Sequence, residues 1–428
     1  MSLKIIFQHT TKYYFISILF LLSVFPIDAQ KGSMLYLENA ETLSFDKESM
    51  DCQVLLGNVR FRQDNIYLYC DTAYFYDTKN TLHAFGNVRI RQGDTLNIYG
   101  KRLYYDGNNK LARVRGKVRM INKSLVLETD SLNYDRQNNK AYYNYGGKLS
   151  DKDNVLTSTQ GIFFLNSKIN VFRQNVRLQS PDLFLTTDSL KYNSNSKIVY
   201  FISPTNMKYQ EKTKIYSERG WYNTQTETSQ LLKNAFVEDA ERKRLKGDSI
   251  LYNKKKGIAE VFHRVEIRDS AQNMSIFGNY AYYNENTKSG LVKDSALMVD
   301  YSSKDTLYLH AKLLKTSEDS ASKIIKGIGN VRFFRNDTQG RCDSLIYLSQ
   351  DSVINMYSNP VLWSDNNQLS GDFIQIYQRN NTIDWVHVQK WAYAIVKEDS
   401  VHYNQLSGKD LKGYIRNGEL YKIEVSQE

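Results

Sequence analysis

Residues 86–106 read GNVRIRQGDTLNIYGKRLYYD, and this stretch decides the fold class. In Val88-Arg89-Ile90-Arg91 apolar and basic side chains alternate, which gives an extended segment two unlike faces. A second alternating segment follows and ends at Leu103–Asp106. No apolar stripe with the 3.6-residue spacing of a helix runs through these residues. The stretch therefore predicts β-strands joined by a polar turn.

Two short motifs recur along the chain with a period of about thirty residues. Copies of Asp-Ser-Leu-x-Tyr, or close variants, begin at Asp130, Asp188, Asp248 and Asp343. Copies of Gly-Asn-Val-Arg, or Gly-Lys-Val-Arg, begin at Gly57, Gly86, Gly116 and Gly329. Weaker copies of the first motif end at Tyr76, Tyr105, Tyr222 and Tyr283, and Tyr76, Tyr105 and Tyr134 follow one another at intervals of 29 residues. The period indicates about a dozen related repeats.

Each repeat is interpreted as a strand with the Asp-Ser motif, a polar turn, a strand that begins with the glycine motif, and a short strand such as Leu96–Ile98. Turns are predicted where Asn, Asp, Gly and Lys gather, at 106–110, 135–140, 193–197 and 284–288. One repeat has too few apolar side chains to close a core, so neighbouring repeats must stack. We predict an all-β fold, an elongated open β-jelly roll or β-solenoid-like array of ~30-residue repeats, with few helices.

The amino terminus has the pattern of a secretory signal peptide. Lys4 and Lys12 precede the apolar run Tyr13–Pro26, and Ala29 suits the position before a cleavage site. A membrane anchor is the alternative, but the run is shorter than the ~20 residues that a spanning helix needs. Residues 1–29 are therefore predicted to be a signal peptide.

The remainder is predicted to form two lobes of one array. The charged segment Glu238–Lys246 interrupts the repeats, and the polar insertion Thr316–Ser322 stretches one of them. Placing the boundary at the first interruption gives a first, β-jelly-roll lobe over residues 30–237. A second, more divergent lobe over residues 238–428 continues the same array.

No motif for catalysis or metal binding occurs in the sequence. The six His residues are scattered, and Cys52, Cys70 and Cys342 have no metal-ligand spacing. Cys52 and Cys70 could pair in an oxidising compartment, although buried apolar roles are favoured. The recurring Asp residues could be imagined as Ca²⁺ ligands or glycosidase acids, and the Tyr residues as a sugar-stacking ladder. Their recurrence in every repeat favours local bonding and packing instead. We predict no enzyme activity, no cofactor and no metal.

The chain is basic, with 57 Lys and Arg against 46 Asp and Glu and a formal net charge of +11. An exported basic protein attracts anionic partners such as a phosphorylated glycolipid or an anionic membrane surface. Nucleic acid is not an expected partner outside the cytoplasm. The alternative is that Arg60, Arg62, Arg89 and Arg91 only form a solvated strand face, and the sequence does not separate these two interpretations.

The order and spacing of these units resemble the LptA/OstA-like family of periplasmic lipopolysaccharide-transport bridge proteins. The resemblance rests on Gly86–Ile90, Leu96–Gly100 and Leu103–Asp106, and on their copies in other repeats. It is clearest between about residues 35 and 150 and fades toward the carboxyl end, where the period is kept. The chain is longer than a single bridge domain, which suggests an extended bridge or an accessory protein.

The resemblance implies an open jelly roll whose apolar groove shields lipopolysaccharide acyl chains, each buried methylene contributing about 0.8 kcal/mol. The implied partners are lipopolysaccharide or lipid A, other transport components of the same fold joined edge to edge, and the outer-membrane translocon. The implied location is the periplasm, at the outer membrane if peripheral. The implied groove residues are the inward apolar positions of the first repeats: Val59, Phe61, Ile66, Leu68, Val88, Ile90, Leu96, Ile98, Val118, Met120, Leu125 and Leu127.

Two other functions fit the same sequence, because a fold does not fix a function. A structural β-solenoid or surface adhesin without lipid cargo would have a closed, fully packed interior. A polysaccharide-acting enzyme would require carboxylates clustered in one cleft. An apolar groove left open along the array would favour lipid binding.

Overall fold

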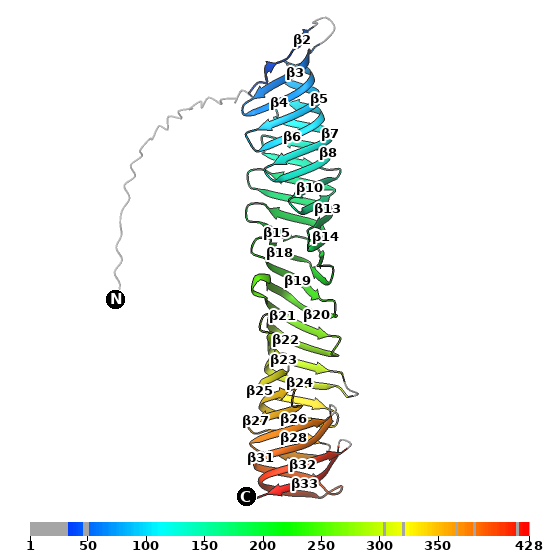
Figure 1. Ribbon diagram of the computed structural model, residues 1–428, viewed down its shortest axis with the longest axis vertical. Helices are drawn as coiled ribbons and strands as arrows, with labels where there is room; N and C mark the ends of the chain where they lie inside the picture. Colours follow the sequence, from blue (N-terminus) through cyan, green and yellow to red (C-terminus); the bar gives the residue numbers. More distant parts are fainter. Residues whose placement is uncertain are drawn as a thin grey trace, which may run out of the picture.

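The computed structural model describes residues 33–45, 51–302, 305–318, 322–364, 366–379, 382–416 and 419–427. These residues form a tall column in which the strands cross the long axis and follow one another in chain order (Figure 1). Their 33 strands form one hydrogen-bonded antiparallel sheet, and their only helical element is the 3-10 turn Lys254–Lys256. The predicted all-β array is confirmed. The predicted signal peptide, residues 1–29, lies outside the described residues.

The strands are 4 to 16 residues long. The first third comprises β1 (Tyr36–Asn39), β2 (Thr42–Phe45), β3 (Gln53–Gln63), β4 (Ile66–Tyr76), β5 (Thr81–Gln92), β6 (Leu96–Asp106), β7 (Leu111–Asn122), β8 (Leu125–Asp135), β9 (Lys140–Tyr143), β10 (Gly147–Asp151) and β11 (Asn154–Ser158). The middle third comprises β12 (Gln160–Phe164), β13 (Ile169–Gln179), β14 (Leu183–Asn193), β15 (Ile198–Phe201), β16 (Thr205–Tyr209), β17 (Thr213–Ser217), β18 (Arg219–Asn223), β19 (Thr228–Glu238), β20 (Lys243–Asn253), β21 (Ile258–Asp269) and β22 (Met274–Asn284). The last third comprises β23 (Ser289–Asp300), β24 (Leu307–Glu318), β25 (Lys323–Arg335), β26 (Thr338–Leu348), β27 (Val353–Tyr357), β28 (Val361–Ser364), β29 (Asn367–Ser370), β30 (Phe373–Arg379), β31 (Thr382–Lys397), β32 (Tyr403–Arg416) and β33 (Glu419–Ser426).

Alternate long strands bend at a pair of residues with positive φ. In β5 the pair is Gly86 (φ 70°) and Asn87 (φ 41°), and the register with β6 shifts there. Such a bulge bends the strand, and glycine adopts this conformation without strain. A Cβ atom on Gly86 would also lie 2.4 Å from Asp71 Oδ2, so the Asp71 side chain would have to move. Corners recur at 57–58, 116–117, 174–175, 233–234, 263–264, 294–295, 329–330, 358–359 and 390–391.

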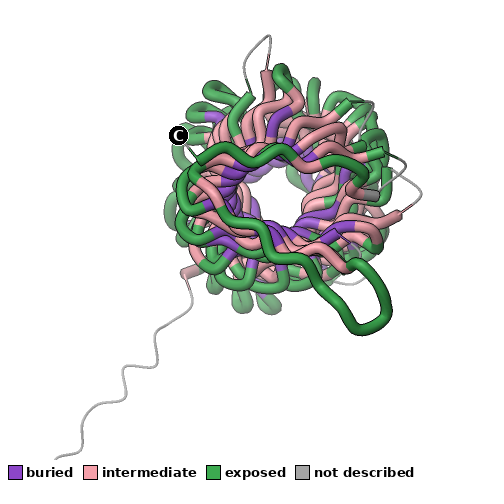
Figure 2. Tube along the Cα trace, turned by 90° about the horizontal axis from the view of Figure 1, so that it is seen from below, coloured by how far each residue is buried: buried purple, intermediate pink, exposed green. Residues whose placement is uncertain are grey.

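The bends divide the sheet into two layers that enclose the core. Layer I contains the halves such as Gln53–Leu56 and Thr72–Tyr76, and layer II contains the halves such as Val59–Gln63 and Ile66–Cys70. Seen along the column the chain forms a ring, with buried residues turned inward and exposed loops outside (Figure 2). One continuous cluster of buried apolar side chains runs from Leu35 to Leu411. Within the described ranges no helix is long and apolar enough to cross a membrane.

The sequence motifs occupy other positions in the strands than predicted. The predicted short strand Leu96–Ile98 and the Leu-x-Tyr motif that follows it form the single strand β6. The recurring Asp therefore lies at a bend in mid-strand and not at a strand start, beside the corner of the next strand. Asp71 accepts a hydrogen bond from Asn87 Nδ2 at 2.9 Å, and Asp248 accepts one from Arg264 Nε at 2.8 Å. The glycine motif likewise forms the corner and does not begin a strand.

The predicted turns are confirmed. Asp106 Oδ1 accepts hydrogen bonds from the backbone N–H groups of Asn108 (3.1 Å) and Asn109 (3.0 Å), and Lys110 has a φ of 52°. A short acidic side chain that bonds its own backbone fixes such a turn.

The ladder of strand pairs continues through the predicted lobe boundary, because β19 pairs with β20 up to Glu238 and Arg244. The division into lobes 30–237 and 238–428 stays a prediction.

Candidate functional site

The twelve predicted groove residues lie together in strands β3 to β8, on the inner face of the column. All except Leu125 are buried, with exposed fractions of 0 to 5%, and Leu125 packs half-buried against the same core. Cα partners such as Phe61 and Leu68, or Ile90 and Ile98, come from adjacent strands. In these repeats the inner side chains fill the interior and exclude water. Their role in lipid binding stays a proposal.

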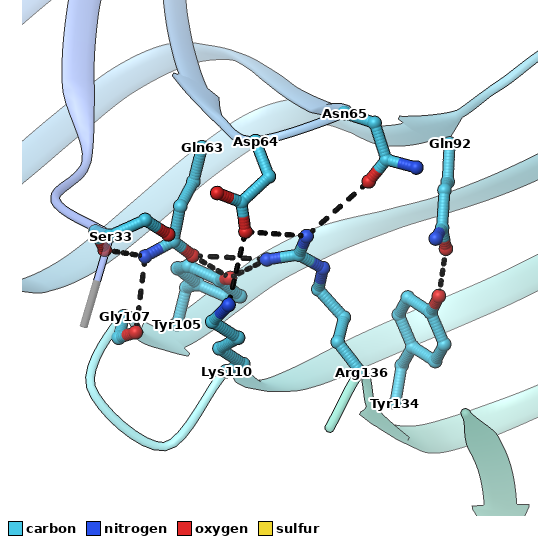
Figure 3. A network of polar contacts seen from close by, with 10 residues as sticks. All are labelled: Ser33, Gln63, Asp64, Asn65, Gln92, Tyr105, Gly107, Lys110, Tyr134 and Arg136. Atoms are coloured by element: carbon cyan, nitrogen blue, oxygen red, sulfur yellow. Dashed lines mark hydrogen bonds and ion pairs between the residues drawn. The ribbon is translucent and has the colours of Figure 1, made fainter. Parts of the chain in front are cut away.

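A polar latch closes the first repeats along the seam where the turns of layer I meet the turns of layer II. We use the word latch for Gln63 and Asp64 of layer II together with Tyr105 and Arg136 of layer I (Figure 3). Arg136 donates from Nη1 to Gln63 Oε1 and to the Tyr105 hydroxyl, both at 3.1 Å. Its Nη2 donates to Asp64 Oδ2 at 3.3 Å, and the side chain is only 6% exposed.

The latch satisfies polar groups that would otherwise be buried without partners. The Tyr105 hydroxyl donates to Gln63 Oε1, and Gln63 Nε2 donates to the carbonyls of Ser33 and of Gly107, the latter at 3.1 Å. One repeat later the Tyr134 hydroxyl donates to Gln92 in the same way. Burial raises the pKa of Tyr134 to about 12 and raises that of Tyr105, so both phenols are protonated donors at neutral pH. The seam is thus held shut by hydrogen bonds over two repeats.

Stability should depend on pH through the latch carboxylate. Partial burial acts to raise the pKa of Asp64, but the neighbouring Ser33 hydroxyl, together with Lys110 (3.1 Å) and Arg136 (3.3 Å), holds it below the usual 3.8. The stabilisation is therefore complete above the unfolded-state pKa and is lost as pH falls through the lower folded-state value. We expect Asp64→Asn to unfold at lower urea concentration than the wild type at pH 7, with the difference vanishing once the pH falls below the folded-state pKa of Asp64. Equal midpoints at pH 7 would contradict a role for this carboxylate.

In the middle repeats the inner face is more open. Ile215, Val237, Leu245 and Ile267 form a cross-strand row through β17, β19, β20 and β21, each the Cα partner of the next. All four pack against the core but are only half-buried, whereas Phe61 and Ile90 at corresponding places are fully buried. We call these four residues the inner row. Water therefore reaches apolar surface here that is sealed in the first repeats.

The seam beside the inner row also lacks a latch. On one side of turn 239–242 the Lys254 ammonium lies 4.7 Å from the Tyr209 ring, and on the other side Lys323 Nζ donates to Gln272 Oε1 at 2.9 Å. Among the described residues, no hydrogen bond or ion pair joins turn 239–242 itself to layer I. This part of the seam is where the two layers are least tied together.

The four arginines that alternate with apolar residues in the first repeats bond to neighbouring side chains. Arg60 and Arg62 form ion pairs with Glu38 at 3.0 and 2.9 Å, and Arg91 pairs with Asp94 at 3.2 Å. Arg89 donates to Asn97 Oδ1 from Nη2 at 2.9 Å. On this outer face three of the four positive charges are ion-paired, and Arg89 donates to an uncharged amide.

The cysteines and the core tyrosines that the sequence singled out are buried. Cys52, Cys70 and Cys342 are free and buried, and burial raises the pKa of Cys70 and of Cys342 to about 12, so both are protonated thiols. Tyr105 and Tyr134 are packed in the core, as the packing interpretation of the tyrosines predicted. Among the described residues, no three His, Cys, Asp or Glu side chains are placed to hold a metal ion.

Comparison with known proteins gives two matches. The family described as OstA-like protein matches residues 32–188 and 227–310, more than half of the chain. Among solved structures, the crystal structure of LptH from Pseudomonas aeruginosa, described as the LptA homologous periplasmic component of the conserved lipopolysaccharide transport device, is similar. The sequences are 14% identical, the match covers 26% of this chain and 80% of LptH, and the TM-score is 0.24. No curated protein matches the sequence.

Proposed function

Because this chain belongs to the OstA-like protein family, we propose that it is a periplasmic, non-enzymatic lipid-binding protein that shields lipopolysaccharide acyl chains during transport to the outer membrane. The observation that carries the proposal is the half-buried inner row beside the unlatched seam. An acyl chain placed there would gain roughly 0.8 kcal/mol for each methylene removed from water.

The proposal places lipid entry in the middle repeats. The residues Val59 to Leu127 of the first repeats belong to the same apolar cluster, and they would extend the binding surface only where the latch opens. The closed interior of those repeats suits the alternative, a structural array without cargo. The half-buried inner row favours lipid binding, since a purely structural core would bury it fully.

The proposed partners would bind the strands at the two ends of the column. Among the described residues, β1 and β2 pair with β3 alone and β33 pairs with β32 alone, so we propose that these strands offer edges to other chains. Apolar side chains are exposed there, among them Tyr36, Phe45 and Tyr421. We propose that transport components of the same fold, and through them the outer-membrane translocon, join these edges.

Mass spectrometry of lipids that copurify with the protein from a periplasm tests the proposal. We expect the wild type to carry lipid A species, and Leu245→Asp combined with Ile267→Asp to remain folded but to lose at least nine-tenths of this lipid, because a carboxylate repels acyl chains. Phe277→Asp is the matched control, since Phe277 is exposed on the outer face of β22. Folded wild-type protein without any lipid would refute the proposal and favour the structural array.

A further inference from the structure

A charged cleft of about 460 Å³ lies on the outer face of layer II, over the inner row. Its walls are the turns at 210–212 and 239–242, the start of the turn after β21, and the strand ends beside them. Five basic side chains line it, namely Lys212, Lys214, Arg242, Arg244 and Arg268. Three acidic side chains also line it, Glu211, Glu238 and Asp239, so positive charge is in excess.

Two arginines face each other across neighbouring strands in this cleft. Lys214, Glu238, Arg244 and Arg268 form one cross-strand row, in which Arg244 of β20 is the Cα partner of Arg268 of β21. Like charges directly opposite one another destabilise a sheet unless an anion lies between them. The positive field is therefore concentrated where β20 and β21 approach the seam.

Ion pairs offset part of this field, but they leave other basic side chains of the cleft without an ion-pair partner among the described residues. Glu238 pairs with Lys214 at 3.3 Å, and Asp239 Oδ1 accepts hydrogen bonds from the backbone N–H groups of Glu241 (3.0 Å) and Lys243 (2.9 Å). Arg268 pairs with Glu266 at 3.3 Å. Within the described part of the chain, the side chains of Arg242 and Lys212 have no ion-pair partner.

Arg244 is held in place with unused hydrogen-bonding capacity. Its guanidinium lies 4.0 Å from the Phe236 ring centroid, and its buried Nε has no hydrogen-bond partner among the described residues. A buried donor without a partner costs about 1–3 kcal/mol. The Nη groups of Arg244 make no hydrogen bond among the described residues either, so they are free to donate to a bound phosphate, whose geometry a planar guanidinium matches.

We infer that this cleft binds the phosphate groups of the acylated glycolipid headgroup, an inference that rests on the proposed function. Strand alternation puts Arg244 beside Leu245 and Arg268 beside Ile267, so the cationic row and the inner row lie on opposite faces of the same strand ends. A phosphorylated amphiphile at the unlatched seam would place its acyl chains on the inner row. Its phosphate groups would lie among Arg242, Arg244 and Arg268.

Binding of two lipids to the lipid-free protein tests the inference. Diphosphorylated lipid A and the same lipid stripped of both phosphates are titrated onto the wild type and onto the double variant Arg244→Gln with Arg268→Gln. The wild type should bind the phosphorylated lipid at least tenfold more tightly, as expected for charge-assisted hydrogen bonds. The double variant should bind both lipids equally. The matched control is Arg119→Gln with Arg177→Gln, two exposed arginines of layer II away from the cleft, and it should keep the preference.

The outcomes distinguish the possible failures. A double variant that still prefers the phosphorylated lipid overturns the headgroup site and leaves the proposed lipid-binding function intact. A wild type that binds neither lipid overturns both. If inorganic pyrophosphate binds the cleft as tightly as the phosphorylated lipid, with the same dependence on Arg244 and Arg268, the site serves free phosphate and the headgroup assignment is wrong.

Discussion

Ile90→Asp is expected to destabilise the protein by at least about 4 kcal/mol, enough to unfold the first repeats. Ile90 is fully buried, and its Cα partners on the two neighbouring strands, Leu68 and Ile98, are buried as well. A carboxylate there would find neither water nor a polar partner. Urea unfolding followed by near-ultraviolet circular dichroism measures the loss, because the surrounding tyrosines report on packing.

The control for this variant lies five residues earlier in the same strand. Phe85 is 38% exposed, so Phe85→Asp should change the free energy of unfolding by no more than about 1 kcal/mol. Wild-type stability of Ile90→Asp would mean that water already reaches this level of the column. The predicted groove in the first repeats would then be open, contrary to the packing described above.

Removing the latch arginine is expected to produce the second-largest loss. Arg136→Met keeps most of the apolar length of the side chain but deletes the four hydrogen bonds to Gln63, Tyr105, Asp64 and Asn65. Buried Gln63 and Tyr105 would each lose a partner, so the free energy of unfolding should fall by roughly 2–4 kcal/mol. Hydrogen exchange should also accelerate at the backbone amides of β3 and β6, where the seam would open.

A second arginine variant, Arg113→Met, is the control that separates the loss of the latch hydrogen bonds from the loss of a positive charge. Arg113 lies on the outer face of β7, is exposed, and has its guanidinium 5.3 Å from the centroid of the Tyr104 ring. Arg113→Met should cost less than about 1 kcal/mol and leave hydrogen exchange unchanged. If both variants behaved alike, the hydrogen bonds across the seam would not be what closes the first repeats.

The sequence predicted the repeat, the strands and the turns because these depend on local patterns. Eleven of the twelve apolar residues chosen by alternation are buried on the inner face, and Asp and Asn residues marked the turns. The bends were missed, although a signal for them exists. In β6 the buried residues Leu96 and Ile98 keep one phase of alternation, and Leu103 and Tyr105 keep the other. That change of phase between Ile98 and Leu103 marks the bend.

The seam could not be predicted in the same way, because it joins residues about forty positions apart. Gln63 and Gln92 end matching strands of consecutive repeats, and each meets a tyrosine 42 residues later. The recurrence of Gln after Arg-x-Arg was a visible signal, but no periodic rule says which turns of two layers meet. The charged segment at 238 was noticed as an interruption. Its excess of positive charge emerges only when strands β17 to β21 lie side by side.

The latch breaks the equivalence of the repeats. In a stack of similar rungs, a bound chain would have nearly the same free energy at every level and would drift without preference. Here a chain bound in the middle repeats would have to displace fully packed side chains and then separate hydrogen bonds in order to move toward the amino-terminal end. The latched repeats would therefore act as a barrier at that end of the column.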